Sequence, residues 1–109
     1  MDHFVPWSRY PVDLGHNFVL AHATCNQDKS NRLAACDHLD RWCRRNAELG
    51  EQLSAAFTRS GLVHDLEASR RVARWAYAQT AASDGHVWVE KSLLIALDPS
   101  WRGLPGMAA

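Results

Sequence analysis

The chain has 109 residues, which is enough for one small domain or for the rear part of a larger one. Apolar residues make up 47% of it and five residues are tryptophan, so it can bury a modest core, but no apolar run is long enough to span a bilayer. The formal net charge is zero, so only a local basic patch could attract a nucleic acid.

The first third of the chain reads as two short strands followed by a helix. Residues 3–7, HFVPW, form an extended run in which Pro6 prevents a helix, and residues 8–15 form a loop with several turn-forming residues. Residues 17–21, NFVLA, suit a second strand that pairs with the first as a hairpin. A helix is expected from Thr24, a plausible N-cap, to about Ala35.

The rest of the chain is predicted to be mainly helical. Apolar residues recur at helical spacing from Leu39 to Phe57, Gly50 is expected to break or bend this helix, and Gly61 to end it. A second helix fits residues 65–82. Residues 86–90, HVWVE, alternate like a short strand that residues 92–97 could extend, and the tail from Gly103 is expected to fray. The tryptophans are expected to be core and helix-packing anchors.

Polar residues at three places in the first third carry the functional signal. An acid, an imidazole and two amides, delivered by two short strands and a helix start, can build a hydrated metal site beside a general base. The pieces are Asp2-His3-x-x-Pro6, Asn17-x-x-Leu20 and Cys25-Asn26-x-x-Lys29. This pattern resembles the HNH endonuclease motif, in the subtype that has asparagine at the third motif position.

The resemblance implies an α+β fold, mostly α-helical, with an N-terminal ββα-metal finger followed by two or three helices and a short C-terminal strand. The finger would span residues 1–35, and residues 36–109 would be a helical extension packed on it as one compact unit. Family members usually have a segment before the Asp-His pair. Because Asp2 follows Met1 directly, we expect an N-terminally shortened member.

The resemblance also implies the chemistry, which is metal-dependent hydrolysis of DNA phosphodiester bonds. His3 would be the general base, since an imidazole titrates near neutral pH, and Asn17 would hold the loop and strand that orient it. Asp2 and Asn26 would be metal ligands, and two oxygen donors that leave room for water suit Mg²⁺ or Mn²⁺ better than Zn²⁺.

Three basic residues are candidates for contacts with DNA phosphates. Lys29 belongs to the family motif, and Arg32 lies three residues further on, on the same helix face. Arg9 lies in the loop between the strands. Such contacts position DNA without reading its sequence. For Arg9 and Arg32, an ordinary solvated charge is an equally good interpretation.

The remaining histidines and cysteines are assigned no catalytic role. His22 and Cys25 stand where zinc-stabilised family members have half of a structural zinc site, but two ligands do not close a tetrahedral site, so no structural zinc is expected. His16 is expected to be a solvated loop residue. Three cysteines, an odd number without a disulfide framework, predict reduced thiols in a cytoplasmic protein, and Cys36 and Cys43 are expected in the core.

Three functions remain open from the sequence. The first is an HNH-type endonuclease or a fragment of one, supported by the joint match of the three motif pieces. The second is a non-catalytic remnant of the finger that binds DNA or protein. The third is a small helical interaction module in which the motif is a coincidence. The zero net charge favours the second and third over the first.

Overall fold

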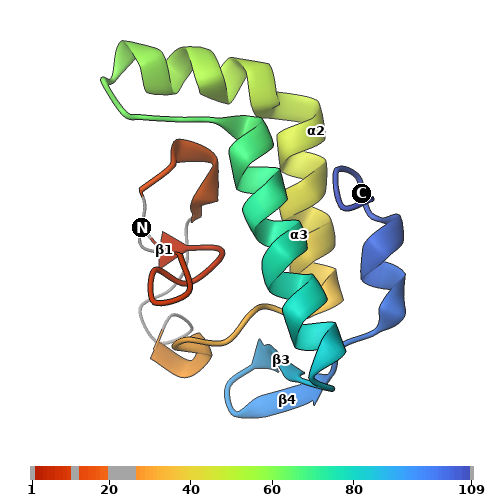
Figure 1. Ribbon diagram of the computed structural model, residues 1–109. Helices are drawn as coiled ribbons and strands as arrows, with labels where there is room; N and C mark the ends of the chain where they lie inside the picture. Colours follow the sequence, from red (N-terminus) through yellow and green to blue (C-terminus); the bar gives the residue numbers. More distant parts are fainter. Residues whose placement is uncertain (1, 11–12, 20–26, 109) are drawn as a thin grey trace.

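The computed structural model of the protein describes residues 2–10, 13–19 and 27–108. Two antiparallel helices form the middle of the molecule, with the N-terminal residues on one side, the C-terminal turn on the other, and a β-hairpin at one end (Figure 1). The fold is therefore α+β and mostly helical, as the sequence predicted.

The described part of the N-terminal segment, which is residues 1–35, contains very little regular structure of its own. Strand β1 (Asp2–His3) pairs antiparallel with β2 (Phe18–Val19), and the 3₁₀ turn η1 (Gly15–Asn17) leads directly into β2. Strand β1 is shorter than predicted, and residues 20–21 of the second predicted strand lie outside the described residues. Residues 27–29 are helical, while residues 20–26 lie outside the described residues.

The helix expected to reach Ala35 ends at Lys29 instead. Ser30 has a φ of 50°, in the left-handed region that ends a helix, and this was not foreseeable from its residue type. The chain then runs to Ala34, which forms a parallel β-bridge with Trp88. Residues 33–35 thus become part of the edge of a second sheet.

Helix α2 (Cys36–Arg59) is the longest element, and it changes direction about halfway along its length (Figure 1). Gly50 is buried at this place, and a Cβ built on it would lie 2.8 Å from Leu66 Cδ2. The Gly50 carbonyl also accepts a hydrogen bond from Ser54 Oγ at 2.8 Å, an i−4 side-chain bond of the kind that bends helices. The predicted bend at Gly50 is confirmed.

Helix α3 (Leu66–Ala82) returns antiparallel to the first half of α2. Its N-cap is Asp65, whose side chain accepts a hydrogen bond from the Ala68 amide at 2.9 Å. Gly61, with a φ of 72°, follows the end of α2 and lets the chain reverse. Both helix boundaries agree with the sequence prediction.

A hairpin of two strands replaces the single short strand that was expected. Strands β3 (His86–Glu90) and β4 (Leu93–Ala96) pair antiparallel across a turn in which Lys91 has a φ of 48°. The outer edge of β3 is taken by the N-terminal segment, because the Trp88 amide and carbonyl bond to Leu33 and Ala35. The hairpin therefore ties the beginning of the chain to its end.

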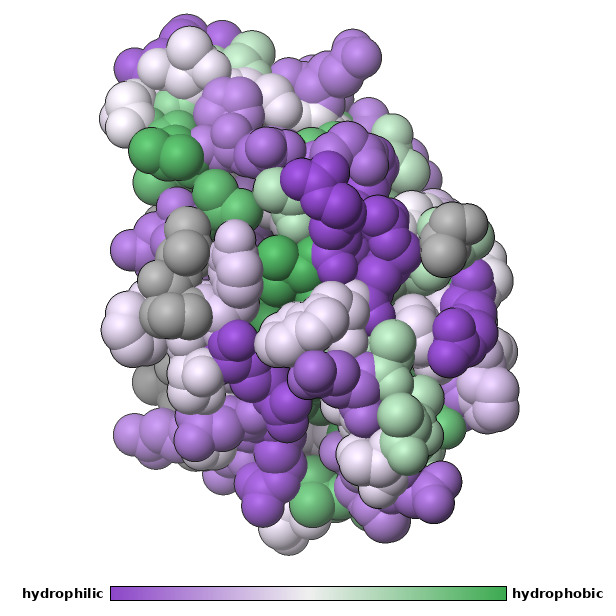
Figure 2. Space-filling view, in the orientation of Figure 1, coloured by the Kyte–Doolittle hydropathy of each residue, from purple (hydrophilic) through white to green (hydrophobic). Residues whose placement is uncertain are grey.

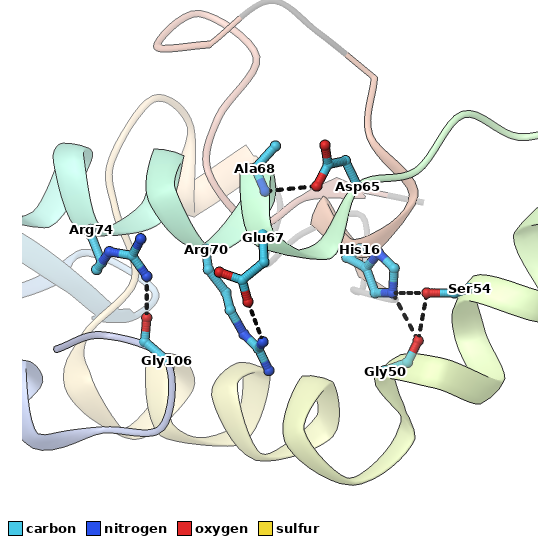
Figure 3. A network of polar contacts seen from close by, with 9 residues as sticks. All are labelled: His16, Gly50, Ser54, Asp65, Glu67, Ala68, Arg70, Arg74 and Gly106. Atoms are coloured by element: carbon cyan, nitrogen blue, oxygen red, sulfur yellow. Dashed lines mark hydrogen bonds and ion pairs between the residues drawn. The ribbon is translucent and has the colours of Figure 1, made fainter. Parts of the chain in front are cut away.

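The C-terminal tail packs on the molecule rather than fraying as expected. The 3₁₀ turn η2 (Pro99–Gly103) places Trp101 in the core, and Met107 is buried as well. Arg74 Nη1 of α3 donates a hydrogen bond to the Gly106 carbonyl at 2.8 Å (Figure 3). The large apolar area of Trp101 and Met107 explains why composition alone misplaced the tail.

One hydrophobic core is shared by all parts of the chain. Its buried members come from the N-terminal segment, both helices, the hairpin and the tail: Phe4, Val5, Leu33, Ala34, Ala35, Leu39, Trp42, Cys43, Ala73, Ala76, Tyr77, Val87, Trp101 and Met107. Of the five tryptophans, Trp7 and Trp75 are about half exposed, which corrects the expectation that all are core anchors. Among the described helices, none is long and apolar enough to cross a membrane.

Candidate functional site

The imidazole of His3 is held from two sides within the β1–β2 pair. His3 stands opposite Phe18 in the register of the two strands, and the two rings lie tilted with centroids 4.7 Å apart. The His3 side chain is 21% exposed, so the ring is largely covered but still reaches solvent. The ring is therefore within reach of a water molecule from solvent.

The second contact of His3 is with a carboxylate from the loop between the strands. His3 Nε2 lies 2.8 Å from Asp13 Oδ1, and the Asp13 side chain is 61% exposed. The sequence identified Asp13 only as a loop-forming residue. No spacing rule points to this pair, because Asp13 lies outside any helix or strand of the described residues.

Asn17 links the two strands through its side chain. It is 6% exposed, its Oδ1 accepts a hydrogen bond from the Val5 amide at 2.8 Å, and its Nδ2 donates to the Val5 carbonyl at 3.0 Å. The Phe4 amide also donates to the Asn17 carbonyl at 2.7 Å. These three bonds fix the chain directly after His3, which is where a residue that orients His3 would act.

Lys29 also contacts the backbone next to His3. Its side chain is buried, and Nζ donates hydrogen bonds to the carbonyls of His3 and Phe4 at 3.2 and 2.9 Å. The ammonium therefore holds the helical residues 27–29 against β1. The sequence predicted a phosphate contact for Lys29; the structure adds a bridging contact that the sequence did not suggest.

Arg9 and Arg32 lie at the surface near one another. Arg9 Nε donates to the Asn31 carbonyl at 2.9 Å, and Ser8 Oγ donates to Asn31 Oδ1 at 3.0 Å. The loop after β1 is thus joined to the turn that carries Arg32, and both arginines are exposed. The two charges stand on the same part of the molecule, as candidate phosphate contacts require.

The two expected metal ligands can be placed only in part. The backbone of Asp2 pairs with Val19 in the β1–β2 ladder, while its side chain and the whole of Asn26 lie outside what the structure describes. The same holds for His22 and Cys25, so the expectation about a structural zinc is not tested. Within the described side chains, no group of three or more His, Cys, Asp or Glu could hold a metal ion.

The donor types at the two ligand positions fit a hard divalent cation. A carboxylate from Asp2 and an amide oxygen from Asn26 are both oxygen donors, and oxygen donors with several waters are the usual surroundings of Mg²⁺. Asp2 directly precedes His3 in β1, so the proposed metal ligand and the proposed base are adjacent residues of one strand. The residues present are therefore compatible with a Mg²⁺ or Mn²⁺ site.

Side chains of helix α2 pack on the N-terminal segment and bind its backbone. The indole of Trp42 stacks on Phe4 with ring centroids 4.7 Å apart and planes 5° from parallel, and its Nε1 donates to the His16 carbonyl at 2.9 Å. Arg45 donates to the carbonyls of His16 and Phe18 at 2.5 and 2.8 Å. These side chains hold η1 and β2 in place, and sequence periodicity identified Trp42 only as a core residue.

His16 is fully buried, which corrects the expectation that it is solvated. Its Nε2 lies 3.1 Å from the Gly50 carbonyl and 3.3 Å from Ser54 Oγ, at the bend of α2 (Figure 3). Burial lowers the pKa of His16 below its ordinary value, because a charged imidazole is poorly solvated there. The neutral ring thus acts as a packing and hydrogen-bonding residue, and His3 remains the histidine with access to solvent at the site.

Comparison with known proteins supports this interpretation for the N-terminal segment. Neither curated proteins nor solved structures gave a match to the chain. Residues 1–35 match the family model described as HNH endonuclease. The suspected resemblance is thus confirmed: the N-terminal third of this chain is similar to the HNH endonucleases, and the match does not extend to residues 36–109.

Proposed function

We propose that this protein is a metal-dependent endonuclease that hydrolyses DNA phosphodiester bonds through an HNH-type ββα-metal site. The observation that carries the proposal is the placement of His3, whose ring is held by Phe18 and Asp13 within the segment that matches the family. A partly exposed, oriented imidazole is what a general base for water requires.

Each residue of the proposed site has a distinct role. His3 takes a proton from the attacking water, and Asn17 keeps His3 in position through its bonds to the backbone of Val5. Asp2 and Asn26 hold a Mg²⁺ or Mn²⁺ ion. When bound, such an ion stabilises the negative charge that grows on the phosphate and the leaving oxygen.

Contacts with the DNA backbone complete the proposal. Arg9 and Arg32 are exposed on two turns that the Arg9–Asn31 hydrogen bond joins, and they contact phosphate oxygens of the DNA backbone. Lys29 contributes its charge from beneath β1, where its ammonium touches the carbonyls of His3 and Phe4. The face shown in Figure 2 carries many hydrophilic side chains with apolar patches between them, so the phosphate contacts of the proposal rest on these three basic residues.

The proposal is tested by plasmid cleavage with Mg²⁺ or Mn²⁺. We expect wild-type protein to nick or linearise the plasmid and His3→Ala to be slower by about 100-fold or more, the lower range for loss of a general base. His86→Ala is the matched control, because His86 is an exposed histidine on β3. Wild-type protein that does not cut with either ion, or His3→Ala that cuts at the wild-type rate, overturns the proposal.

The metal ligands are tested separately by titration of the cation. We expect Asp2→Asn to need a higher Mg²⁺ concentration for half-maximal cleavage, because a neutral amide binds the cation more weakly than a carboxylate. Asp84→Asn, at the exposed end of α3, is the control and should keep the wild-type requirement. Equal requirements for all three proteins would remove Asp2 from the site.

A second function is that of a non-catalytic finger that binds DNA or protein, and two observations weaken the case for cleavage. The chain has zero formal net charge, and the ammonium of Lys29 is bonded to carbonyls within the protein. Gel-shift titration with salt separates the two functions. Retention of DNA that weakens steeply with salt, together with the absence of cleavage, would select the binding function.

A further inference from the structure

We propose that Asp13 is a positioning residue for His3, which fixes the orientation of the ring and determines which ring nitrogen receives the proton of the attacking water. This inference rests on the proposed nuclease function and adds a residue to it. Asp13 lies outside the three motif pieces, and the structure alone brings it to His3.

The contact between His3 and Asp13 determines which ring nitrogen carries the hydrogen. A carboxylate oxygen can only accept a hydrogen bond, so the hydrogen between His3 Nε2 and Asp13 Oδ1, 2.8 Å apart, belongs to the imidazole. In a neutral imidazole one nitrogen carries the hydrogen and the other carries the lone pair. The bond to Asp13 therefore assigns the lone pair, and the role of proton acceptor, to Nδ1.

The backbone that follows Asp13 is anchored in the protein. The next two residues, Leu14 and Gly15, are buried, and the Gly15 amide donates to the Val63 carbonyl at 2.9 Å. A Cβ built on Gly15 would lie 2.6 Å from the Phe57 ring, so the second half of α2 packs directly against this backbone. An exposed ion pair usually has little effect on stability, but here the buried neighbours fix the backbone from which the carboxylate extends.

The His3 ring is also held by a second contact. The ring of His3 lies against Phe18, and the His3 backbone is paired in β1. With Phe18 on one side and Asp13 at Nε2, rotation of the ring about its χ angles is restricted. A base held in this way needs little reorganisation before it reacts.

The proton transfer balances without further reactants. A hydrogen of the attacking water moves to His3 Nδ1, and the resulting hydroxide forms a bond to phosphorus. The bond from phosphorus to the leaving sugar oxygen breaks, and this oxygen takes a proton from solvent. Asp13 remains a carboxylate throughout and stabilises the imidazolium that forms, as in other carboxylate–histidine pairs.

The test compares Asp13→Ala and Asp13→Glu with wild-type protein, with Asp37→Ala, an exposed aspartate at the start of α2, as the control. We expect Asp13→Ala to lower the cleavage rate at saturating DNA by about tenfold, in the lower range for loss of a residue that orients a histidine. Asp13→Glu should recover part of this loss, and the DNA concentration for half-maximal rate should stay the same. A merely structural residue would not give this separation of rate from DNA affinity.

A second readout does not depend on cleavage. Two-bond ¹H–¹⁵N correlations of the neutral His3 ring report the tautomer, and we expect the Nε2–H form in wild-type protein and ring-nitrogen shifts closer to a mixture in Asp13→Ala. Cleavage by wild-type protein with no loss of rate in Asp13→Ala overturns the role of Asp13 alone. Wild-type protein that does not cut overturns the proposed function and this role with it. An unchanged tautomer in Asp13→Ala overturns the claim that Asp13 determines the tautomer, and an Nδ1–H form in wild-type protein overturns the assignment of the acceptor role to Nδ1.

Discussion

The N-terminal segment and the helical segment, residues 36–109, are held together in different ways. The helical segment has two long helices, a hairpin and most of the buried core. The described part of the N-terminal segment has two strands of two residues each, and side-chain bonds to backbone groups supply much of what fixes it. The candidate catalytic residues thus lie on the part with the least regular structure, and the helices make that part rigid.

The largest expected effect tests this dependence directly. Trp42→Ala removes the stacking on Phe4 and the hydrogen bond to the His16 carbonyl, so we expect a loss of about 3–5 kcal/mol in the free energy of unfolding. Chemical denaturation followed by circular dichroism measures it. Trp75→Ala is the control, because Trp75 is 48% exposed on α3 and its loss should cost about 1 kcal/mol, clearly less than the loss of Trp42. Similar losses for both variants would show that the N-terminal segment does not depend on α2.

The next effect concerns polar support rather than packing. Arg45→Met leaves the Phe18 carbonyl without its bond from Nη1 and removes one of two bonds to the His16 carbonyl. We expect a loss of about 2 kcal/mol, the usual range for a group left unsatisfied. Arg44→Met, which removes only a surface pair with Asp40, should change stability by about 0.5 kcal/mol or less in the same denaturation experiment. An equal effect of the two substitutions would contradict a supporting role for Arg45.

A smaller effect is expected at Lys29, for which a structural role and a DNA contact must be separated. Lys29→Met removes the bonds to the carbonyls of His3 and Phe4, and we expect a loss of about 1.5 kcal/mol, since charged donors form the stronger hydrogen bonds. Arg32→Met should leave stability unchanged and only reduce the salt dependence of DNA binding. A Lys29→Met protein of wild-type stability would show that these two hydrogen bonds do not stabilise the fold.

The smallest effect is a dependence on pH. Burial lowers the pKa of His16, so below the ordinary value of 6.5 the unfolded chain binds the proton more readily than the folded protein. The stabilising contribution of His16 is therefore present above pH 6.5 and is lost as the pH falls through the folded pKa. We expect melting temperatures between pH 7.5 and 5 to decline less in His16→Gln than in wild type, whereas His86→Gln should retain the wild-type decline. A slope that His16→Gln leaves unchanged would contradict the assignment.

Sequence reasoning was reliable where one local rule determines the structure. Helical spacing predicted α3 within one residue at its start, and Gly50 and Gly61 marked the bend and the end of α2. The motif spacing predicted the family resemblance that the match to residues 1–35 confirms. In each case the signal lies in neighbouring residues and needs no knowledge of distant contacts.

Sequence reasoning was less reliable where packing between distant parts of the chain determines the structure. The buried state of His16, the packed tail with Trp101, and the early end of the helix at Ser30 all depend on partners far away in the chain or on a backbone angle that residue type does not fix. The contact between His3 and Asp13 also falls in this class, since an irregular loop creates it. The convergence of Asp2 and Asn26 on one cation remains a prediction.

The side chain of Asn17 serves as a surrogate peptide group that continues the ladder between β1 and β2 beyond their two paired residues. Loss of its amide nitrogen by deamidation would leave a carboxylate, which can only accept hydrogen bonds. The Val5 carbonyl would then face an anionic oxygen in place of a donor, with almost no change in side-chain volume. Chemical ageing at this single residue would loosen the junction behind His3 while the helices kept their shape.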